Sequence, residues 1–129
     1  MKGIIMIAVT VFFSSLVHAQ TSCDAIVGKW LKTPKEDLVI KVYKAGSEYR
    51  GKVLKEKDEM KKQAVGFVIL ENLQYDKDKQ VWKDGKIHDP ISGKTYDAEA
   101  TINEDGTLEV KCYMGMKFLG TKKYFKRVK

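Results

Sequence analysis

Residues 38–53, LVIKVYKAGSEYRGKV, alternate between apolar and polar side chains with a period of two on both sides of a short turn. In the first half, Leu38, Ile40 and Val42 fall on one face of an extended chain. Ala45-Gly46-Ser47 is typical of a hairpin connection, and the alternation resumes after it. This stretch therefore predicts two antiparallel strands joined by a tight turn.

The same period recurs in residues 96–102 and 108–114, and turn sequences separate such runs at short intervals. The predicted turns are Asp76–Lys79, Asp84-Gly85 and Asn103–Gly106. Helical period is confined to the charged residues 56–63, which form either a loop or one turn of helix. About eight short strands in sequence predict a meander, and closure removes the edges that an open sheet exposes. The expected fold is all-β: a small antiparallel up-and-down β-barrel of about eight strands.

Residues at the two ends of the predicted barrel support closure. Gly28-Lys29-Trp30 opens the first strand, and Arg127 lies in the last. In calycin-like barrels, the lipocalin- and streptavidin-like folds, a Gly-x-Trp begins strand one and a basic residue of the last strand lies over the indole. A cation over a tryptophan face is attractive by roughly 0.5–2 kcal/mol. We expect Gly28 to let the chain pass close beneath the barrel floor.

The first residues have the composition of a secretory signal peptide. Met1-Lys2 gives a positive start, residues 3–17 are almost wholly apolar, and Val17-His18-Ala19 offers small residues to a signal peptidase. The apolar run is short for a membrane span, so a retained anchor is the less favoured alternative. We predict a signal peptide at 1–19, one barrel domain at 20–129, and a periplasmic or extracellular protein without stable membrane insertion.

The charge of the mature chain is that of a lysine-rich surface. Residues 1–19 contain one lysine and no acid, so the remainder has 23 basic and 17 acidic residues, a formal charge of +6. These charges are interspersed, which is typical of a solvated surface. Export and the lack of an aromatic platform among the C-terminal lysines argue against nucleic acid as a partner.

Two cysteines, Cys23 and Cys112, enter an oxidising compartment in which pairing is expected if geometry allows. Cys112 follows the inward alternation of residues 108–114, and Ser22 could cap a short turn that brings Cys23 near it. An intramolecular disulfide and a free, buried Cys112 both remain open. A lipid anchor at Cys23 is not expected, because Gln20-Thr21-Ser22 lacks the apolar residue of a lipobox.

Residues 87–96, IHDPISGKTY, gather groups that could be catalytic. Consecutive strand residues point to opposite faces, so His88 and Asp89 do not converge on one substrate. Ser92 lies at a turn tip, where nothing holds it against a base. We therefore expect no catalytic residues. His88 is also the only histidine after residue 19, and scattered acids around one histidine predict no metal site and no cofactor.

The same segment has the residues of a tight turn between two strands. Asp89 can accept backbone N–H groups ahead of it, Pro90 presets φ at the second position, and Gly93 suits a left-handed conformation. These residues predict a hairpin.

Taken together, these motifs resemble the bacterial domain of unknown function DUF2147. The resemblance runs through Gly28-Lys29-Trp30, Tyr49–Val53, Trp82–Ile87, Asp89-Pro90, Gly93–Tyr96, Leu108–Val110, Gly115, Leu119–Thr121 and Phe125–Val128. It implies a secreted, lipocalin-like barrel with no established biochemical activity. The chain departs from the family in its loop 57–63, which lacks an Asn-Pro-Asp, and at His88, Cys112 and Phe125, where Tyr, Gly and Trp are common.

The interior of an eight-stranded barrel is either filled by side chains or holds one small ligand. The residues expected to line it are Tyr49, Phe67, Trp82, Tyr96 and Met114. We expect an exported, non-catalytic barrel that binds a small apolar or amphipathic molecule or a cell-envelope component. The alternative is a structural or protein-interaction module with a filled core and no ligand.

Overall fold

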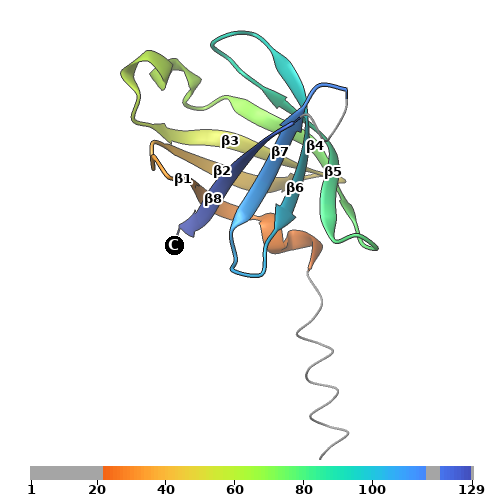
Figure 1. Ribbon diagram of the computed structural model, residues 1–129. Helices are drawn as coiled ribbons and strands as arrows, with labels where there is room; N and C mark the ends of the chain where they lie inside the picture. The colour runs from red at the N-terminus through yellow and green to blue at the C-terminus, as the bar shows by residue number, and fades with distance from the viewer. Residues whose placement is uncertain (1–21, 116–119, 129) are drawn as a thin grey trace, which may run out of the picture.

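Eight antiparallel strands close into one barrel in the computed structural model, which describes residues 22–115 and 120–128 (Figure 1). The strands are β1 (Gly28–Thr33), β2 (Leu38–Ala45), β3 (Glu48–Glu56), β4 (Val68–Asp76), β5 (Val81–His88), β6 (Thr95–Ile102), β7 (Leu108–Tyr113) and β8 (Thr121–Val128). Each pairs with its neighbours in sequence, and β1 pairs with β8 to complete the circle. The predicted all-β, up-and-down barrel is confirmed. The predicted signal peptide, residues 1–19, lies outside the described residues.

The hairpin predicted from residues 38–53 is formed by β2 and β3. Ala45 pairs with Glu48 across a two-residue turn, in which Gly46 has a φ of +65° that favours glycine. Ile40, Val42 and Tyr49 are almost fully buried, whereas the residues between them reach solvent. The period of two in the sequence therefore separates the inside of the barrel from its surface.

One predicted turn, Asp84-Gly85, is wrong, because both residues lie within β5. Asp84 has a φ of +62°, and Asn72 in the neighbouring strand β4 has a φ of +61°. The Asn72 side-chain amide donates to the Asp84 carbonyl at 3.0 Å, so the two irregular positions are bonded to each other. A Cβ on Gly85 would lie 2.6 Å from Leu73 Cδ2. Gly85 is needed for close packing inside the sheet, and in the sequence such a glycine cannot be told from a glycine of a turn.

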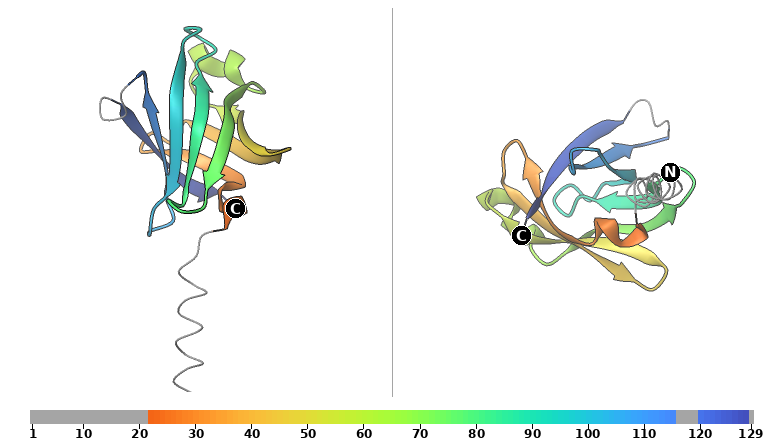
Figure 2. Two further views of the ribbon diagram at one scale, coloured as in Figure 1. Left: turned by 90° about the vertical axis from the view of Figure 1, so that its right-hand side faces the viewer. Right: turned by 90° about the horizontal axis from the view of Figure 1, so that it is seen from below.

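The two ends of the barrel are built differently. The closed end carries the short helix η1 (Cys23–Ile26) and the turns β2–β3, β4–β5 and β6–β7; the open end carries the connections β1–β2, β3–β4, β5–β6 and β7–β8. Figure 2, in its view from below, shows η1 lying across the closed end. The second short helix, η2 (Glu59–Ala64), lies in the β3–β4 connection at the open end. Of the two alternatives expected for residues 56–63, a loop or a turn of helix, the structure has the helix.

Candidate ligand-binding site

The closed end is sealed by η1, whose carbonyl groups accept hydrogen bonds from side chains of the barrel. Ser22 caps this helix, as expected, by accepting from the Asp24 N–H at 3.2 Å. Trp30 Nε1 donates to the Ile26 carbonyl at 2.9 Å, and Trp82 Nε1 donates to the Cys23 carbonyl at 3.0 Å. Both indoles are fully buried, so the half of the interior next to the closed end is a packed core.

Arg127 joins the two ends of the chain at this floor. Its Nη1 donates to the Val27 carbonyl at 2.9 Å, and its Nη2 donates to the Ala25 carbonyl at 2.6 Å. The guanidinium lies 4.2 Å from the centre of the Trp30 ring, which confirms the predicted cation–π contact. Gly28 passes beside it with a φ of +139°, and a Cβ there would lie 2.6 Å from Arg127 Nη1. Gly28, Trp30 and Arg127 therefore lie together at the floor.

Tyr49 belongs to the same floor. Its hydroxyl donates to Asp24 Oδ1 at 2.5 Å, and only 3% of the residue is exposed. Burial, and then the bond to Asp24, raise the pKa of Tyr49 far above its usual value, so the phenol remains a neutral donor. The arrangement holds η1 in place.

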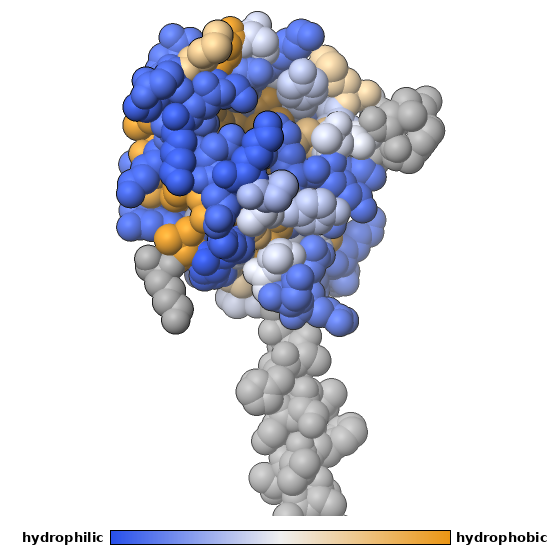
Figure 3. All heavy atoms as spheres, turned by 60° about the vertical axis from the view of Figure 1, so that its left-hand side comes forward, coloured by the Kyte–Doolittle hydropathy of each residue, from blue (hydrophilic) through white to orange (hydrophobic). Residues whose placement is uncertain are grey.

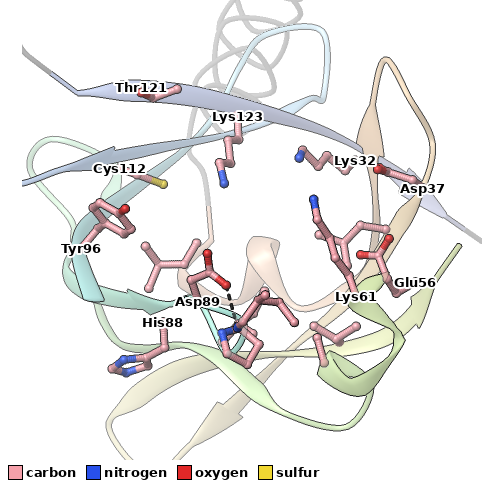
Figure 4. A pocket seen from close by; sticks show the side chains of 17 residues that line it. Lys32, Asp37, Glu56, Lys61, His88, Asp89, Tyr96, Cys112, Thr121 and Lys123 are labelled. Atoms are coloured by element: carbon pink, nitrogen blue, oxygen red, sulfur yellow. Dashed lines mark hydrogen bonds between the residues drawn. The ribbon is translucent and has the colours of Figure 1, made fainter. Parts of the chain in front are cut away.

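The open half of the barrel contains a cavity of about 450 Å³. Its apolar wall is formed by Leu38, Val53, Ala64, Ile69, Ile87, Ile91, Tyr96 and Cys112. Charged side chains surround the mouth, and they are Lys32, Asp37, Glu56, Lys61, Asp89 and Lys123 (Figure 4). The site is thus apolar inside and charged at its entrance.

A second hollow lies on the outside of the barrel, between η2 and strands β1 to β3. Leu31, Val39 and Leu54 are among its lining residues, and they face away from the interior. Because the interior cavity is more enclosed, it is the better candidate for binding a small molecule.

The two lysines of the mouth on β1 and β8 face into the barrel. Lys32 pairs with Phe125, which is 4% exposed, and Lys123 pairs with Val110, which is 2% exposed. Paired residues of antiparallel strands project to the same side of the sheet, and these partners belong to the core. Lys32 and Lys123 therefore stand at inward positions. The sequence signal was present, because Lys32 is in phase with Trp30 and Lys123 with Phe125.

The residues expected to line a ligand site separate into three groups. Tyr96 lines the cavity. Tyr49 and Trp82 are buried in the closed half. Phe67 and Met114 lie on connections at the open end, where 55% and 65% of each residue is exposed. The structure therefore brings one of the five into the wall of the cavity.

The predicted hairpin at residues 87–96 is confirmed. Asp89 Oδ1 accepts from the Ile91 N–H at 2.9 Å and from the Ser92 N–H at 3.3 Å. Gly93, with a φ of +78°, donates its N–H to the Asp89 carbonyl at 2.8 Å. The hydrogen bond from Ile91 is the main reason why the pKa of Asp89 lies below its usual range. Asp89 and Pro90 also line the mouth of the cavity.

Replacing Asp89 with alanine should lower the free energy of unfolding at neutral pH by about 1 kcal/mol, by analogy with a lost helix cap. Because folding lowers the pKa of Asp89, its carboxylate stabilises the protein above the unfolded-state pKa of about 4. That contribution is lost as the pH falls through the folded-state pKa. Urea denaturation at neutral pH and in acid measures both effects, and Asp89→Asn, which keeps an acceptor, is the control. A deficit in Asp89→Ala that persists unchanged in acid would contradict this account.

His88 and Asp89 project to opposite sides, as the alternation predicts. His88 Nε2 lies 2.8 Å from Glu71 Oε1, and His88 Nδ1 lies 2.9 Å from Thr95 Oγ1. In Figure 4 the imidazole lies away from the Asp89 carboxylate. Both ring nitrogens have partners on the neighbouring strands, so the histidine joins β4, β5 and β6.

The disulfide alternative is wrong, because Cys23 and Cys112 are both free. Cys23 is exposed at the closed end, where its carbonyl accepts from Trp82. Cys112 lines the cavity at the other end and pairs with Thr121. Burial raises the pKa of the Cys112 thiol. The two cysteines therefore lie at opposite ends of the barrel.

Within residues 22–115 and 120–128, no group of three or more His, Cys, Asp or Glu side chains is placed to hold a metal ion. The same part of the chain contains no helix with the length and apolar character of a membrane span.

A closed eight-stranded barrel with a sealed floor and a cavity at the opposite end has a lipocalin-like fold. The family model "Uncharacterized protein conserved in bacteria (DUF2147)" matches residues 28–127, and the chain belongs to this family. Among solved structures it is similar to protein HP1028 from the human pathogen Helicobacter pylori, described as belonging to the lipocalin family. The TM-score is 0.66 at 19% identity, over 81% of this chain and 83% of that one, a likeness that shows the fold alone. No curated protein matches the sequence.

Proposed function

We propose that this protein is an exported, non-catalytic barrel that binds one small amphipathic molecule at its open end. The observation that carries the proposal is the cavity of about 450 Å³ with an apolar wall and a charged mouth. Ligand pockets commonly have volumes of about 300–1,000 Å³ and are mainly apolar with a few polar groups. The composition of residues 1–19 supports export.

Apolar side chains around the mouth are consistent with entry of such a molecule. Of the large apolar residues that are exposed, those on the connections or strand ends at the open end are Met60, Val65, Phe67, Val68, Ile91 and Met114. At the closed end, among the described residues, only Val27 belongs to this set. Figure 3 shows a mainly hydrophilic surface with apolar side chains at its upper, open end. The same rim also favours a second candidate function, a protein-interaction module, since exposed apolar patches mark interaction surfaces.

Binding of the uncharged fluorescent probe N-phenyl-1-naphthylamine tests the proposal. We expect saturable binding with one site per barrel. Thr121→Trp, on the cavity lining, should abolish it by filling the mouth, and Lys122→Trp, the next residue on β8, should not. Circular dichroism establishes that both variants fold. No saturable binding to the wild type, or equal binding to Thr121→Trp, would overturn the proposal and leave the interaction module as the better candidate.

A further inference from the structure

We infer that the cavity selects amphiphiles with a single anionic head group, held between the ammonium groups of Lys32 and Lys123. This inference rests on the proposed function and specifies the chemistry of its ligand. The two lysines come from β1 and β8, the strands that close the barrel, and both stand at inward positions. Figure 4 shows their side chains extending into the space above the apolar wall.

The first supporting observation is that these lysines have no ion-pair partner. Outward lysines of β8 are paired: Lys122 Nζ lies 3.9 Å from Glu109 Oε2, and Lys126 Nζ lies 2.6 Å from Glu36 Oε1. Within the described part of the chain, no carboxylate oxygen lies within 4.0 Å of Lys32 or Lys123 Nζ. On β8, therefore, the lysine without an ion pair is the one that lines the cavity.

The acidic residues of the mouth differ in this respect. Asp89 Oδ1 accepts two backbone N–H groups of its own turn, and Glu56 Oε1 accepts from the Asp58 N–H at 3.0 Å. Asp37 has a buried oxygen, Oδ1, without a hydrogen bond, and its charge acts on Lys32 from beyond ion-pair distance. Two of the three carboxylates are therefore engaged locally, which leaves the ammonium groups available to a ligand.

The second supporting observation is electrostatic. Burial, and then repulsion from Lys123, lower the pKa of Lys32, so its charged form is disfavoured where it stands. Lys123 lines the same cavity as Cys112 and Asp89, and its charge also acts on both of these groups. Two like charges held near each other without a partner weaken the folded protein, and an anion between them would relieve both. An apolar tail would then lie against the wall that contains Ile69, Ile87 and Tyr96.

Competition against the bound naphthylamine probe tests the inference with one tail and different head groups. Below their micelle concentrations, dodecanoate and dodecyl phosphate represent carboxylate and phosphate heads, dodecanol a neutral head, and dodecylamine a cationic one. We expect at least one of the two anions to bind at least about tenfold more tightly than dodecanol, because hydrogen bonds to charged groups are stronger than neutral ones. Dodecylamine should bind most weakly. The ranking of the two anions identifies the head group.

The variant Lys32→Met/Lys123→Met should lose at least about tenfold in affinity for the preferred anion and keep its affinity for dodecanol and the probe. Its melting temperature should be unchanged or higher, which a purely structural role for these lysines would not produce. The matched control is Lys122→Met/Lys126→Met on the outer face of β8, with wild-type selectivity expected. Equal binding of all head groups, or retained preference in the inward variant, would overturn the inference while leaving the proposed function intact. Failure of the uncharged probe itself would overturn the proposed function.

Discussion

Replacing Trp82 with alanine is expected to lower the free energy of unfolding by about 3–5 kcal/mol, the range for truncating a large buried aromatic residue. Trp82 has 0% exposure, and its ring centre lies 4.8 Å from that of Tyr75. Its Nε1 is also the donor to the Cys23 carbonyl in η1. The substitution therefore creates a cavity in the core and removes a hydrogen bond that holds the floor. Chemical denaturation monitored by circular dichroism measures the loss.

Trp82→Phe separates the two contributions. Phenylalanine retains most of the apolar volume and lacks the N–H, so we expect a smaller loss of about 1–3 kcal/mol. Because Trp82 lies in the closed half, Trp82→Phe should also bind the naphthylamine probe as the wild type does. A loss below about 1 kcal/mol in Trp82→Ala would show that the floor is not packed as described.

Replacing Arg127 with alanine is expected to lower the free energy of unfolding by about 2–3 kcal/mol. The guanidinium donates to the carbonyls of Ala25 and Val27 and lies over the Trp30 ring, so one side chain joins η1, β1 and β8. Hydrogen bonds that involve a charged group are stronger than neutral ones. The removal of Arg127 leaves two carbonyls at the end of η1 without these donors.

The matched control for Arg127 is its neighbour Lys126. Lys126 pairs with Glu36 on the surface, with Nζ to Oε1 at 2.6 Å, and such exposed pairs contribute about 1 kcal/mol or less. Lys126→Ala should therefore cost much less than Arg127→Ala in the same denaturation experiment. Arg127→Lys keeps the positive charge but lacks the bidentate donor geometry of the guanidinium, so its loss of unfolding free energy should lie between those of the two alanine variants. Equal losses in Lys126→Ala and Arg127→Ala would contradict the role of the guanidinium at the floor.

The two halves of the interior explain how one barrel contains both a core and a cavity. In the closed half, Trp30, Tyr49 and Trp82 fill the space and bond to η1 or the residues around it. In the open half, small or inward-facing polar residues such as Ala64 and Thr121 leave the volume unfilled. Burial of the floor stabilises the fold, and the inward lysines at the mouth do not contribute to that packing.

Much of the fold could be predicted from patterns that involve only residues close together in the sequence. The alternation in residues 38–53 predicted β2, β3 and the faces of their side chains, because period two depends only on strand geometry. The Asp89 turn and the Ser22 cap followed from hydrogen bonds within a few residues of each. The Trp30–Arg127 contact was predicted from the resemblance of Gly28-Lys29-Trp30 to the first strand of lipocalin-like barrels, in which a basic residue of the last strand lies over the indole. The prediction of a turn at Asp84-Gly85 was wrong because Gly85 is required for close packing against Leu73 on the neighbouring strand β4.

The sequence by itself determined strand order, closure and, within the strands, which side chains point inward. Only the tertiary structure decided depth along the barrel axis, since depth depends on strand stagger and on η1 sealing one end. That is why Trp82 became part of the floor, Tyr96 part of the cavity wall, and Cys23 and Cys112 remained apart. It is also why Lys32 and Lys123, which are inward by their phase, both line the mouth, because closure places β1 beside β8. No acid of the described chain lies within ion-pair distance of either lysine.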